Sequence, residues 1–326
     1  MTKNAKTIFL ILIILVLGGL LYYSKKVDKS SDPSSNSFSP LGCYVARIDK
    51  DIYTLVIEEE KEGKVSGKLA YNNFEKDSSS GTLVGNYEDE VLLGNYLFTS
   101  EGMESDREVI FKRSGENFIQ GFGPVNSFGG KETFKDISEV TYNPSHTFTK
   151  SPDCLEHFTD RAQTVSFDYN SFFAAREGDK TATVDWILNG QQKGLLLASL
   201  FVPKAYLPNT NFSDAHLTVG RSSDPNAINE CTSHLTGNEE DGESLDVGGY
   251  PFTKFTLHDA GAGNLWETTS YRGIVDGDCY VAEYTIHSTN IANYADDQKI
   301  KEFDKSKIEN ELENTIKSIK FLVNSD

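Results

Sequence analysis

The four cysteines are the residues of this sequence whose chemistry is easiest to predict. They lie far apart, at Cys43, Cys154, Cys231 and Cys279, and none forms the C-x-x-C spacing of a redox pair or a zinc site. Cys43 and Cys154 bracket the first half of the chain, and the other two lie in the second half, so of the three possible pairings we favour 43–154 and 231–279. Each closed loop would stabilise the fold by roughly 4 kcal/mol. Buried free thiols are the alternative.

The histidines give no metal signature. The sequence holds six of them, none in a spacing such as H-E-x-x-H: His146, His157, His216, His234, His258 and His287. Glu283 and His287 are four residues apart and would share one face of a strand, and His258 with Asp259 would lie on a neighbouring strand. We interpret these as polar residues of a solvated sheet face, with metal binding as the lesser hypothesis. We therefore predict neither a metal nor a cofactor.

The sequence contains no catalytic motif. It lacks the nucleophile elbow G-x-S-x-G, the phosphate loop G-x-x-x-x-G-K-[ST] and the dinucleotide fingerprint G-x-G-x-x-G. Acidic runs occur at 58–60 and 239–241, but carboxylate pairs are frequent in so acidic a chain, so we interpret both runs as solvated loops. We assign no catalytic residue and predict that the protein is not an enzyme.

Aromatic side chains in the second half form a candidate binding surface. Tyr250, Phe252, Phe255, Trp266 and Tyr271 fall on successive strand-like segments and would line a groove if they were exposed together. A half-buried sheet also needs alternating aromatic residues, so core packing is the alternative. A shared exposed groove would fit a peptide or a glycan.

The charge of the chain excludes one class of partner. The chain has 326 residues, with 31 Lys and Arg against 49 Asp and Glu, which gives a formal net charge of -18. A nucleic-acid-binding protein needs a basic face that neutralises phosphates, so we predict no nucleic-acid partner. Aromatic residues make up 11% of the chain, which favours a folded protein over a disordered one.

The first 40 residues contain a candidate membrane anchor. Residues 7–23 read TIFLILIILVLGGLLYY, without a charge, which is just long enough for a transmembrane helix whose two tyrosines lie at the lipid boundary. Residues 1–6 would be a cytoplasmic tail, and residues 24–40, rich in Ser and Pro, a flexible linker. A cleaved signal peptide with Lys3 and Lys6 as its positive region is the alternative.

The orientation of this anchor is predicted from the rest of the chain. Lysines flank the apolar stretch on both sides, so the positive-inside rule gives a near tie. The even number of cysteines and the acidic body favour export to an oxidising space. We therefore expect a single-pass protein that contacts the cell membrane through residues 7–23, with its C-terminal bulk outside the cytoplasm.

Residues 41–142 alternate as antiparallel strands do. Strand-like segments recur about every ten residues with turn residues between them, from CYVARID at 43–49 to NFIQGFG at 117–123. The pattern predicts a closed or nearly closed β-barrel domain, and it is similar to the small lipocalin-like barrels of bacterial envelope proteins. Residues 143–159, marked by Pro144 and Pro152, would connect this domain to the next.

Residues 160–326 predict an antiparallel sheet covered by a helix. Strand-like segments occur at 194–203, 215–221, 250–259, 264–273 and 279–288. Near the C-terminus Asp304 is a candidate N-cap, and Ile308, Leu312 and Ile316 recur every four residues, as on the buried face of a helix. The fold class is therefore α+β, with an anchor helix, a barrel-like domain and a sheet with a packed C-terminal helix.

Two stretches of the second half carry a likeness to a known fold. FVPKAYLPNTNFSDAHLTVGRS at 201–222 and the helix-then-strand ending ENTIKSIKFL at 313–322, together with the strands between them, resemble the Mog1/PsbP-like α/β sandwich. The resemblance implies an accessory or binding protein, because that fold carries no shared catalytic residues. Fold analogy by itself does not establish a function.

Three functions fit these observations. The first, which we favour, is a membrane-tethered extracytoplasmic protein with two non-enzymatic binding or scaffolding modules for a protein, peptide or glycan. The second is a barrel that carries or senses a small apolar ligand, which a cavity on the order of several hundred Å³ would favour. The third is an envelope hydrolase, which would need a pocket with at least two convergent titratable groups.

Overall fold

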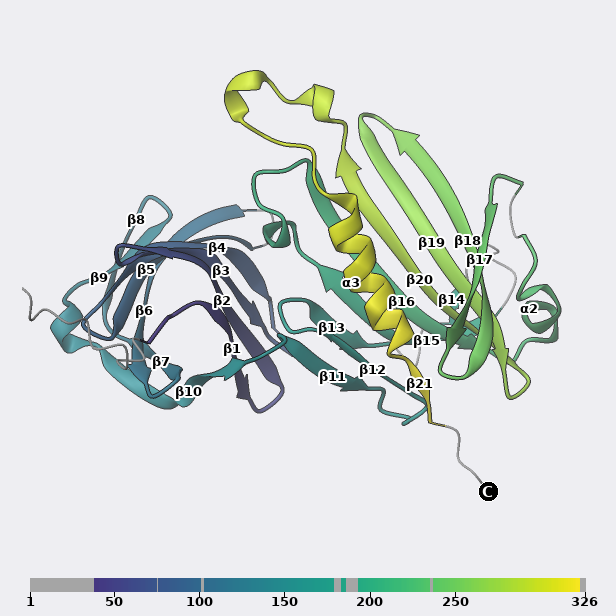
Figure 1. Ribbon diagram of the computed structural model, residues 1–326, viewed down its shortest axis with the longest axis horizontal. Coiled ribbons are helices and arrows are strands. Elements are labelled where there is room, and N and C mark those ends of the chain that lie inside the picture. The colour runs from purple at the N-terminus through teal and green to yellow at the C-terminus, as the bar shows by residue number, and fades with distance from the viewer. Residues whose placement is uncertain are drawn as a thin grey trace, which may run out of the picture. The chain divides into compact units, whose positions relative to one another are not determined.

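The first half of the chain folds into a closed antiparallel barrel. Its eight strands are β1 (Gly42–Ile48), β2 (Asp51–Lys61), β3 (Lys64–Asn72), β4 (Ser79–Glu88), β5 (Val91–Ser100), β6 (Met103–Ser114), β7 (Asn117–Phe122) and β10 (Thr141–Ser151). They pair in the order β5-β4-β3-β2-β1-β10-β7-β6, and the pairing of β5 with β6 closes the ring. The predicted antiparallel barrel is therefore confirmed, and its strands appear in purple to teal in Figure 1.

This computed structural model describes residues 38–74, 76–100, 103–178, 183–185, 193–234 and 237–322. The predicted tail at 1–6, the predicted anchor at 7–23 and all but the last three residues of the linker at 24–40 lie outside the described residues. Within the described ranges, no helix has both the length and the apolar character needed to cross a membrane.

Glycines inside the strands let the barrel wall coil tightly. Gly85 of β4 lies directly opposite Gly94 of β5. A Cβ atom on Gly85 would lie 2.3 Å from the carbonyl oxygen of Leu93 and 2.6 Å from the Cα atom of Gly94. A side chain at this position would therefore force the two strands apart, which explains why glycine occupies it.

The barrel runs past the predicted boundary at residue 142. Strand β10 pairs with β7 on one side and with β1 on the other, so its residues up to Ser151 belong to the barrel and not to the predicted connection at 143–159. Pro144 suggested a connection because proline donates no ladder hydrogen bond. It lies where the register of β7 and β10 shifts, between Tyr142 and Thr147, so the ladder loses nothing there.

A small hairpin beside the barrel was not predicted from the sequence. It consists of β8 (Val125–Phe128) and β9 (Lys131–Phe134), and β9 pairs in parallel with β6. Gly129 and Gly130 form its tip with φ angles of 59° and 82°, which are conformations that favour glycine. Phe128 at this tip is 91% exposed.

The second half forms an antiparallel sheet in the order β13-β15-β16-β20-β19-β18-β17, with β14 also pairing with β15. Its strands are β13 (Ala174–Glu177), β14 (Thr183–Asp185), β15 (Lys193–Val202), β16 (Phe212–Ser222), β17 (Glu240–Val247), β18 (Tyr250–Gly261), β19 (Asn264–Val275) and β20 (Asp278–Thr289). The turn from β18 to β19 consists of Ala262 and Gly263, both with positive φ, as a tight two-residue hairpin requires.

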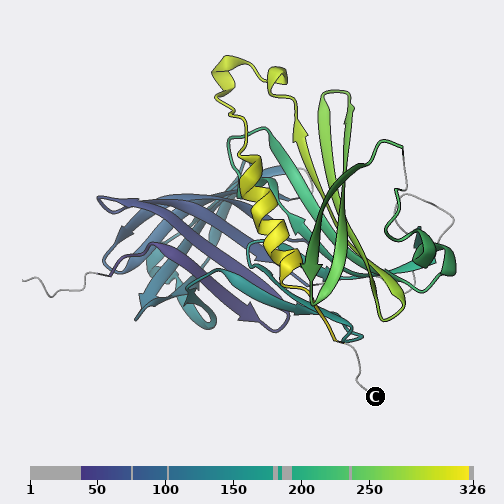
Figure 2. The same cartoon turned by 45° about the vertical axis from the view of Figure 1, so that its right-hand side comes forward.

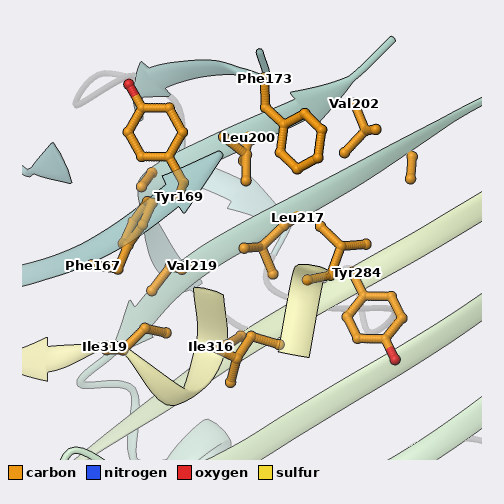
Figure 3. Close-up of a cluster of buried hydrophobic side chains, with 14 of the residues drawn as sticks. Phe167, Tyr169, Phe173, Leu200, Val202, Leu217, Val219, Tyr284, Ile316 and Ile319 are labelled. Atoms are coloured by element: carbon orange, nitrogen blue, oxygen red, sulfur yellow. The ribbon is translucent and has the colours of Figure 1, made fainter. Parts of the chain in front are cut away.

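Helix α3 (Lys305–Lys317) covers one face of this sheet, as Figure 2 shows. The Asp304 carboxylate accepts a hydrogen bond from the backbone N–H of Ser306, so the predicted N-cap is confirmed. The predicted stripe of apolar residues on α3 is buried, and Figure 3 shows Ile316 and the following Ile319 packed among side chains of the sheet. One other α-helix, α2 (Pro225–Glu230), occurs among the described residues.

The hydrophobic core of the second half extends to the outer wall of the barrel. A small third sheet made of β11 (Leu155–Thr159), β12 (Val165–Asn170) and β21 (Lys320–Phe321) contributes to that core, which also includes Ala70 of the barrel wall. The Thr54 hydroxyl donates to the carbonyl oxygen of Ser171 at 2.8 Å, and the Asn72 amide donates to that of Phe173 at 2.9 Å. Pro40–Asp326 accordingly forms a single compact unit.

Both predicted disulfides are present. Cys43 of β1 is bonded to Cys154, and Cys231 is bonded to Cys279 of β20. The second bond lies in a small apolar cluster on the face of the sheet opposite α3, together with Ala227 of α2. The disulfides therefore attach β11 to the barrel and α2 to the sheet, so the alternative of buried free thiols is wrong.

Candidate functional site

One end of the barrel is open and forms a pocket of about 490 Å³. Neighbouring strands run in opposite directions, so the starts of β2, β4 and β6 meet the ends of β3, β5 and β7 there. The β8–β9 hairpin and β10 complete the wall. The lining residues are Tyr53, Tyr71, Asn73, Asp77, Ser79, Phe98, Arg107, Glu108, Val109, Gln120, Gly121, Phe122, Gly123, Val125, Glu132, Phe134 and His146. The volume lies in the range of small-molecule sites.

The rest of the barrel interior is filled by side chains. Leu55, Leu69, Tyr96, Phe111 and Phe118 are each completely buried. The barrel therefore combines a cavity of the size expected for ligand binding with an interior packed by side chains. The packed interior gives the pocket a rigid floor, because the side chains of a close-packed core hold one another in place.

Aromatic rings form much of the pocket wall. The rings of Tyr53 and Tyr71 meet edge to face with 4.8 Å between centroids, and those of Phe122 and His146 do the same at 4.8 Å. Such contacts fix the orientation of each ring by its neighbour. Burial raises the pKa of the Tyr53 and Tyr71 phenols and lowers the pKa of the His146 imidazole, so all three side chains are uncharged at pH 7.

Gln120 provides the least satisfied polar group of the pocket. Its side chain is 6% exposed, and its amide nitrogen donates to the Tyr71 hydroxyl at 2.6 Å. Its buried amide oxygen, Oε1, has no hydrogen-bond partner among the described residues. An unpaired buried acceptor costs about 1–3 kcal/mol. A ligand with a donor group in this pocket would recover that free energy.

The charged residues of the pocket are mostly acidic. Arg107 donates from Nε to Glu132 at 2.6 Å, and its guanidinium carbon lies 5.4 Å from the ring centroid of Phe98. Glu108 accepts a hydrogen bond of 2.8 Å from the backbone N–H of Phe134. The described lining residues include one guanidinium group, that of Arg107, and three carboxylates, those of Asp77, Glu108 and Glu132. The pocket therefore has an excess of negative charge.

This pocket was not predicted from the sequence, although β6 and β7 each carry a signal for it. In NFIQGFG, Phe118, Gln120 and Phe122 are every second residue, so their side chains point to the same face of β7. A lone glutamine between two phenylalanines on an inward-facing row is unusual, because buried positions are normally apolar. Arg107 gives the same signal on β6, where Val109 and Phe111 follow on the same side.

The aromatic residues predicted as a binding surface do not share one face of the sheet. Tyr250, Phe252 and Tyr271 lie on the face that α3 covers, where they belong to or pack against the core. Phe255 and Trp266 lie on the opposite face, because adjacent strand positions alternate between faces. Phe252, Phe255 and Tyr271 are each no more than 2% exposed, as the core-packing interpretation expects.

The predicted histidine pairs take other partners. The His287 imidazole lies 3.0 Å from a carboxylate oxygen of Asp214 and 2.9 Å from the side-chain oxygen of Asn264, and its ring stacks on Trp266. His258 lies 3.5 Å from a carboxylate oxygen of Glu267. Across the part of the chain that the structure describes, no three His, Cys, Asp or Glu side chains converge as metal ligands.

The two acidic runs were predicted to be solvated loops. Residues 58–60 are exposed, as predicted, but they belong to strand β2. The second run leads into β17, and the Glu239 side chain is 2% exposed and paired with Arg272, which is also buried. Arg272 Nη2 donates to Glu239 at 2.6 Å and Nη1 donates at 3.3 Å, so the pair is bidentate. The interpretation as a solvated loop was wrong because the partner lies 33 residues away in the sequence.

A third charged residue borders this pair. Burial raises the pKa of the Glu283 carboxyl above its ordinary value, although a hydrogen bond from Ser270 and the charge of Arg272 act in the opposite direction. The Glu283 oxygen Oε2 is buried and finds no hydrogen-bond partner within the described ranges. The cluster thus holds one cation for two carboxyl groups, Glu239 and Glu283.

The comparisons with known proteins give distant structural likenesses and no family. No protein-family model matches the chain, and no curated protein matches its sequence significantly. A crystal structure from Bacteroides thetaiotaomicron VPI-5482 aligns over 52% of this chain and 50% of its own, about half its length, with 9% identity and a TM-score of 0.31. The immunity protein TplEi of T6SS from Pseudomonas aeruginosa, complexed with "L" peptide, aligns over 87% and 99%, with 11% identity and a TM-score of 0.24.

Proposed function

We propose that this protein is a non-enzymatic binding protein whose barrel takes a small ligand at its open end. The observation that carries the proposal is the unpaired amide oxygen of Gln120 in a pocket of about 490 Å³ with aromatic walls. Sites for small ligands combine apolar and aromatic walls with a few polar groups that fix orientation. The proposal joins the two binding functions expected from the sequence, with a ligand that is polar as well as apolar.

The carboxylates of the pocket favour binding over acid–base catalysis. Glu132 is paired with Arg107, and Glu108 accepts the backbone N–H of Phe134. A general acid or base must be free to exchange a proton with a substrate. Both of these side chains instead hold the β8–β9 hairpin against β6, so we assign them a structural and electrostatic role.

The compartment and the finer family likenesses belong to the same proposal. The two disulfides support an oxidising space outside the cytoplasm, where the predicted anchor at 7–23 would hold the protein. We also propose that the barrel is related to lipocalin-like barrels and that the second half is related to the Mog1/PsbP-like sandwich. Protease treatment of intact cells tests the location: the proposal predicts digestion of the body, and a fully protected body would contradict it.

The binding proposal is tested with benzyl alcohol, a small uncharged aromatic probe with one hydroxyl donor. We expect saturable shifts of the Gln120 side-chain amide NMR signal, identified by its loss in Gln120→Leu, with a Kd on the order of 1 mM. Ser79 lines the pocket, whereas Ser80 is the next residue of the same strand and lines a different surface hollow.

These two serines give a matched pair of variants. Ser79→Trp should fill the pocket and abolish the shifts, and Ser80→Trp should leave them intact. Thermal unfolding of both variants shows that each is folded before the comparison is made. Equal binding to the two variants would mean that the probe does not occupy the pocket, and the proposal would fail.

A further inference from the structure

We propose that the open end of the barrel selects cationic organic ligands, an organic ammonium or guanidinium group, over neutral and anionic ones. This inference rests on the proposed binding function of the pocket and names its ligand class. It is carried by two independent observations: the excess of carboxylates over cations among the lining residues, and the buried amide oxygen of Gln120 that has no hydrogen-bond partner among the described residues.

The charge balance of the pocket excludes an anion. Arg107 is the one Lys or Arg among the described lining residues, and its charge is compensated by Glu132 at 2.6 Å. Glu108 and Asp77 remain, and neither has a lysine or arginine partner within the described lining. A unit charge at 4 Å contributes about 1 kcal/mol even in bulk water, and more in a partly enclosed site. The pocket therefore attracts positive charge and repels negative charge.

The hydrogen-bond groups of the pocket point to a donor ligand. The amide nitrogen of Gln120 donates to the Tyr71 hydroxyl, and its buried amide oxygen has no hydrogen-bond partner among the described residues. The Tyr53 hydroxyl lies 3.1 Å from the Asn73 side-chain oxygen, which is an acceptor. Ammonium and guanidinium groups carry only donors, so they match a pocket rich in acceptors.

The aromatic walls contribute to the same preference. The rings of Tyr53, Tyr71 and Phe122 line the pocket together with Gln120. A cation over an aromatic face gains about 0.5–2 kcal/mol, depending on how far it is desolvated. Because Tyr53, Tyr71 and His146 are uncharged at pH 7, nothing in this wall offsets the attraction.

The test compares three probes of one shape that differ in charge: benzylammonium, benzyl alcohol and benzoate. Binding of each is followed through the Gln120 side-chain amide signal of the purified chain at pH 7. We expect benzylammonium to bind about ten-fold more tightly than benzyl alcohol, and benzoate to bind more weakly than both. Added salt should reduce the advantage of benzylammonium and leave benzyl alcohol unchanged.

Charge-neutral variants connect the preference to named residues. The double variant Glu108→Gln with Asp77→Asn should bring the Kd of benzylammonium to that of benzyl alcohol. Glu116→Gln is the matched control, because Glu116 lies in the β6–β7 turn at the opposite end of the barrel. It removes one negative charge from the protein, against two in the double variant, and should leave the ten-fold preference in place.

The outcomes separate the two proposals. If all three probes bind with similar affinity, or benzoate binds most tightly, the charge preference is wrong and the binding function stands. If none of the probes shifts the Gln120 signal, the binding function fails and the charge preference fails with it. A preference that Glu116→Gln abolishes as fully as the double variant would also overturn the inference, because the net charge of the protein would then be its cause.

Discussion

Two neighbouring glutamates of the second sheet should respond to the same substitution with opposite signs. Glu239 forms a bidentate, fully buried pair with Arg272, whereas Glu283 adds a second carboxyl group to a cluster with one cation. Glu239→Gln removes the carboxylate that pairs directly with the buried Arg272, and breaking a buried ion pair in this way typically costs 3–5 kcal/mol. We expect a loss in the free energy of unfolding of about 3 kcal/mol or more at pH 7.

Glu283→Gln should instead stabilise the protein. A carboxyl group whose pKa is raised by folding binds its proton more tightly in the folded state than in the unfolded state. Its ionisation therefore reduces stability as the pH rises through its ordinary value of 4.5 toward the raised value. The uncharged amide avoids this loss, so the advantage of Glu283→Gln should grow between pH 4.5 and pH 7.

Urea unfolding at pH 5 and pH 7, followed by far-UV circular dichroism, measures both effects. The wild type, the two single variants and Arg272→Met are compared. Arg272→Met removes the cation and leaves both carboxyl groups, so it should also destabilise. If Glu239→Gln and Glu283→Gln lowered the free energy of unfolding by similar amounts at pH 7, the two carboxyl groups would be equivalent, and this account of the cluster would be refuted.

Three further predictions concern the barrel pocket, the helix and the disulfides. Gln120→Leu should keep the free energy of unfolding within about 1 kcal/mol of wild type, because it removes an unpaired acceptor along with one hydrogen bond. It should also weaken benzyl alcohol binding, which is followed in this variant through the methyl NMR signals of Val109, a residue that lines the pocket. Ile316→Ala should cost about 2–5 kcal/mol in urea unfolding, since Ile316 lies on the buried face of α3 and is completely buried. Replacing Cys43 and Cys154 by alanine should lower the free energy of unfolding by about 0.7 kcal/mol more than replacing Cys231 and Cys279. The reason is that the first bond closes the longer loop, with a sequence separation of 111 against 48. A reversed order in urea unfolding would contradict the loop-entropy explanation.

Local patterns in the sequence predicted most of the secondary structure. The strands of the barrel and the buried stripe of α3 follow from alternation and from four-residue spacing, which need only neighbouring residues. The cysteine pairing followed from position along the chain. The β8–β9 hairpin escaped because its strands are only four residues long and mostly exposed. Strand β10 was not predicted because Pro144 is typical of a connection between domains. Its place in a strand is explained only by the register shift between β7 and β10, which the sequence does not reveal.

The candidate site depends on contacts between distant segments. Tyr71, Arg107 and Gln120 come from three different strands, and only closure of the barrel brings them to one pocket. The aromatic residues between 250 and 271 were predicted to line one groove because they lie on successive strands. The register of these strands, which places them on two opposite faces of the sheet, is not visible in the sequence. Glu239 looked solvated for the same reason, since burial by Arg272 is not encoded in its neighbours along the chain.

The position of a bound probe tests the central proposal most directly. Val109 lines the pocket and is 3% exposed, whereas Val84 lies on the barrel wall outside that pocket and is 62% exposed. The proposal predicts intermolecular nuclear Overhauser effects from the ring protons of benzylammonium to the methyl groups of Val109 and none to those of Val84. Contacts with Val84 and none with Val109 would place the ligand outside the barrel and contradict the account.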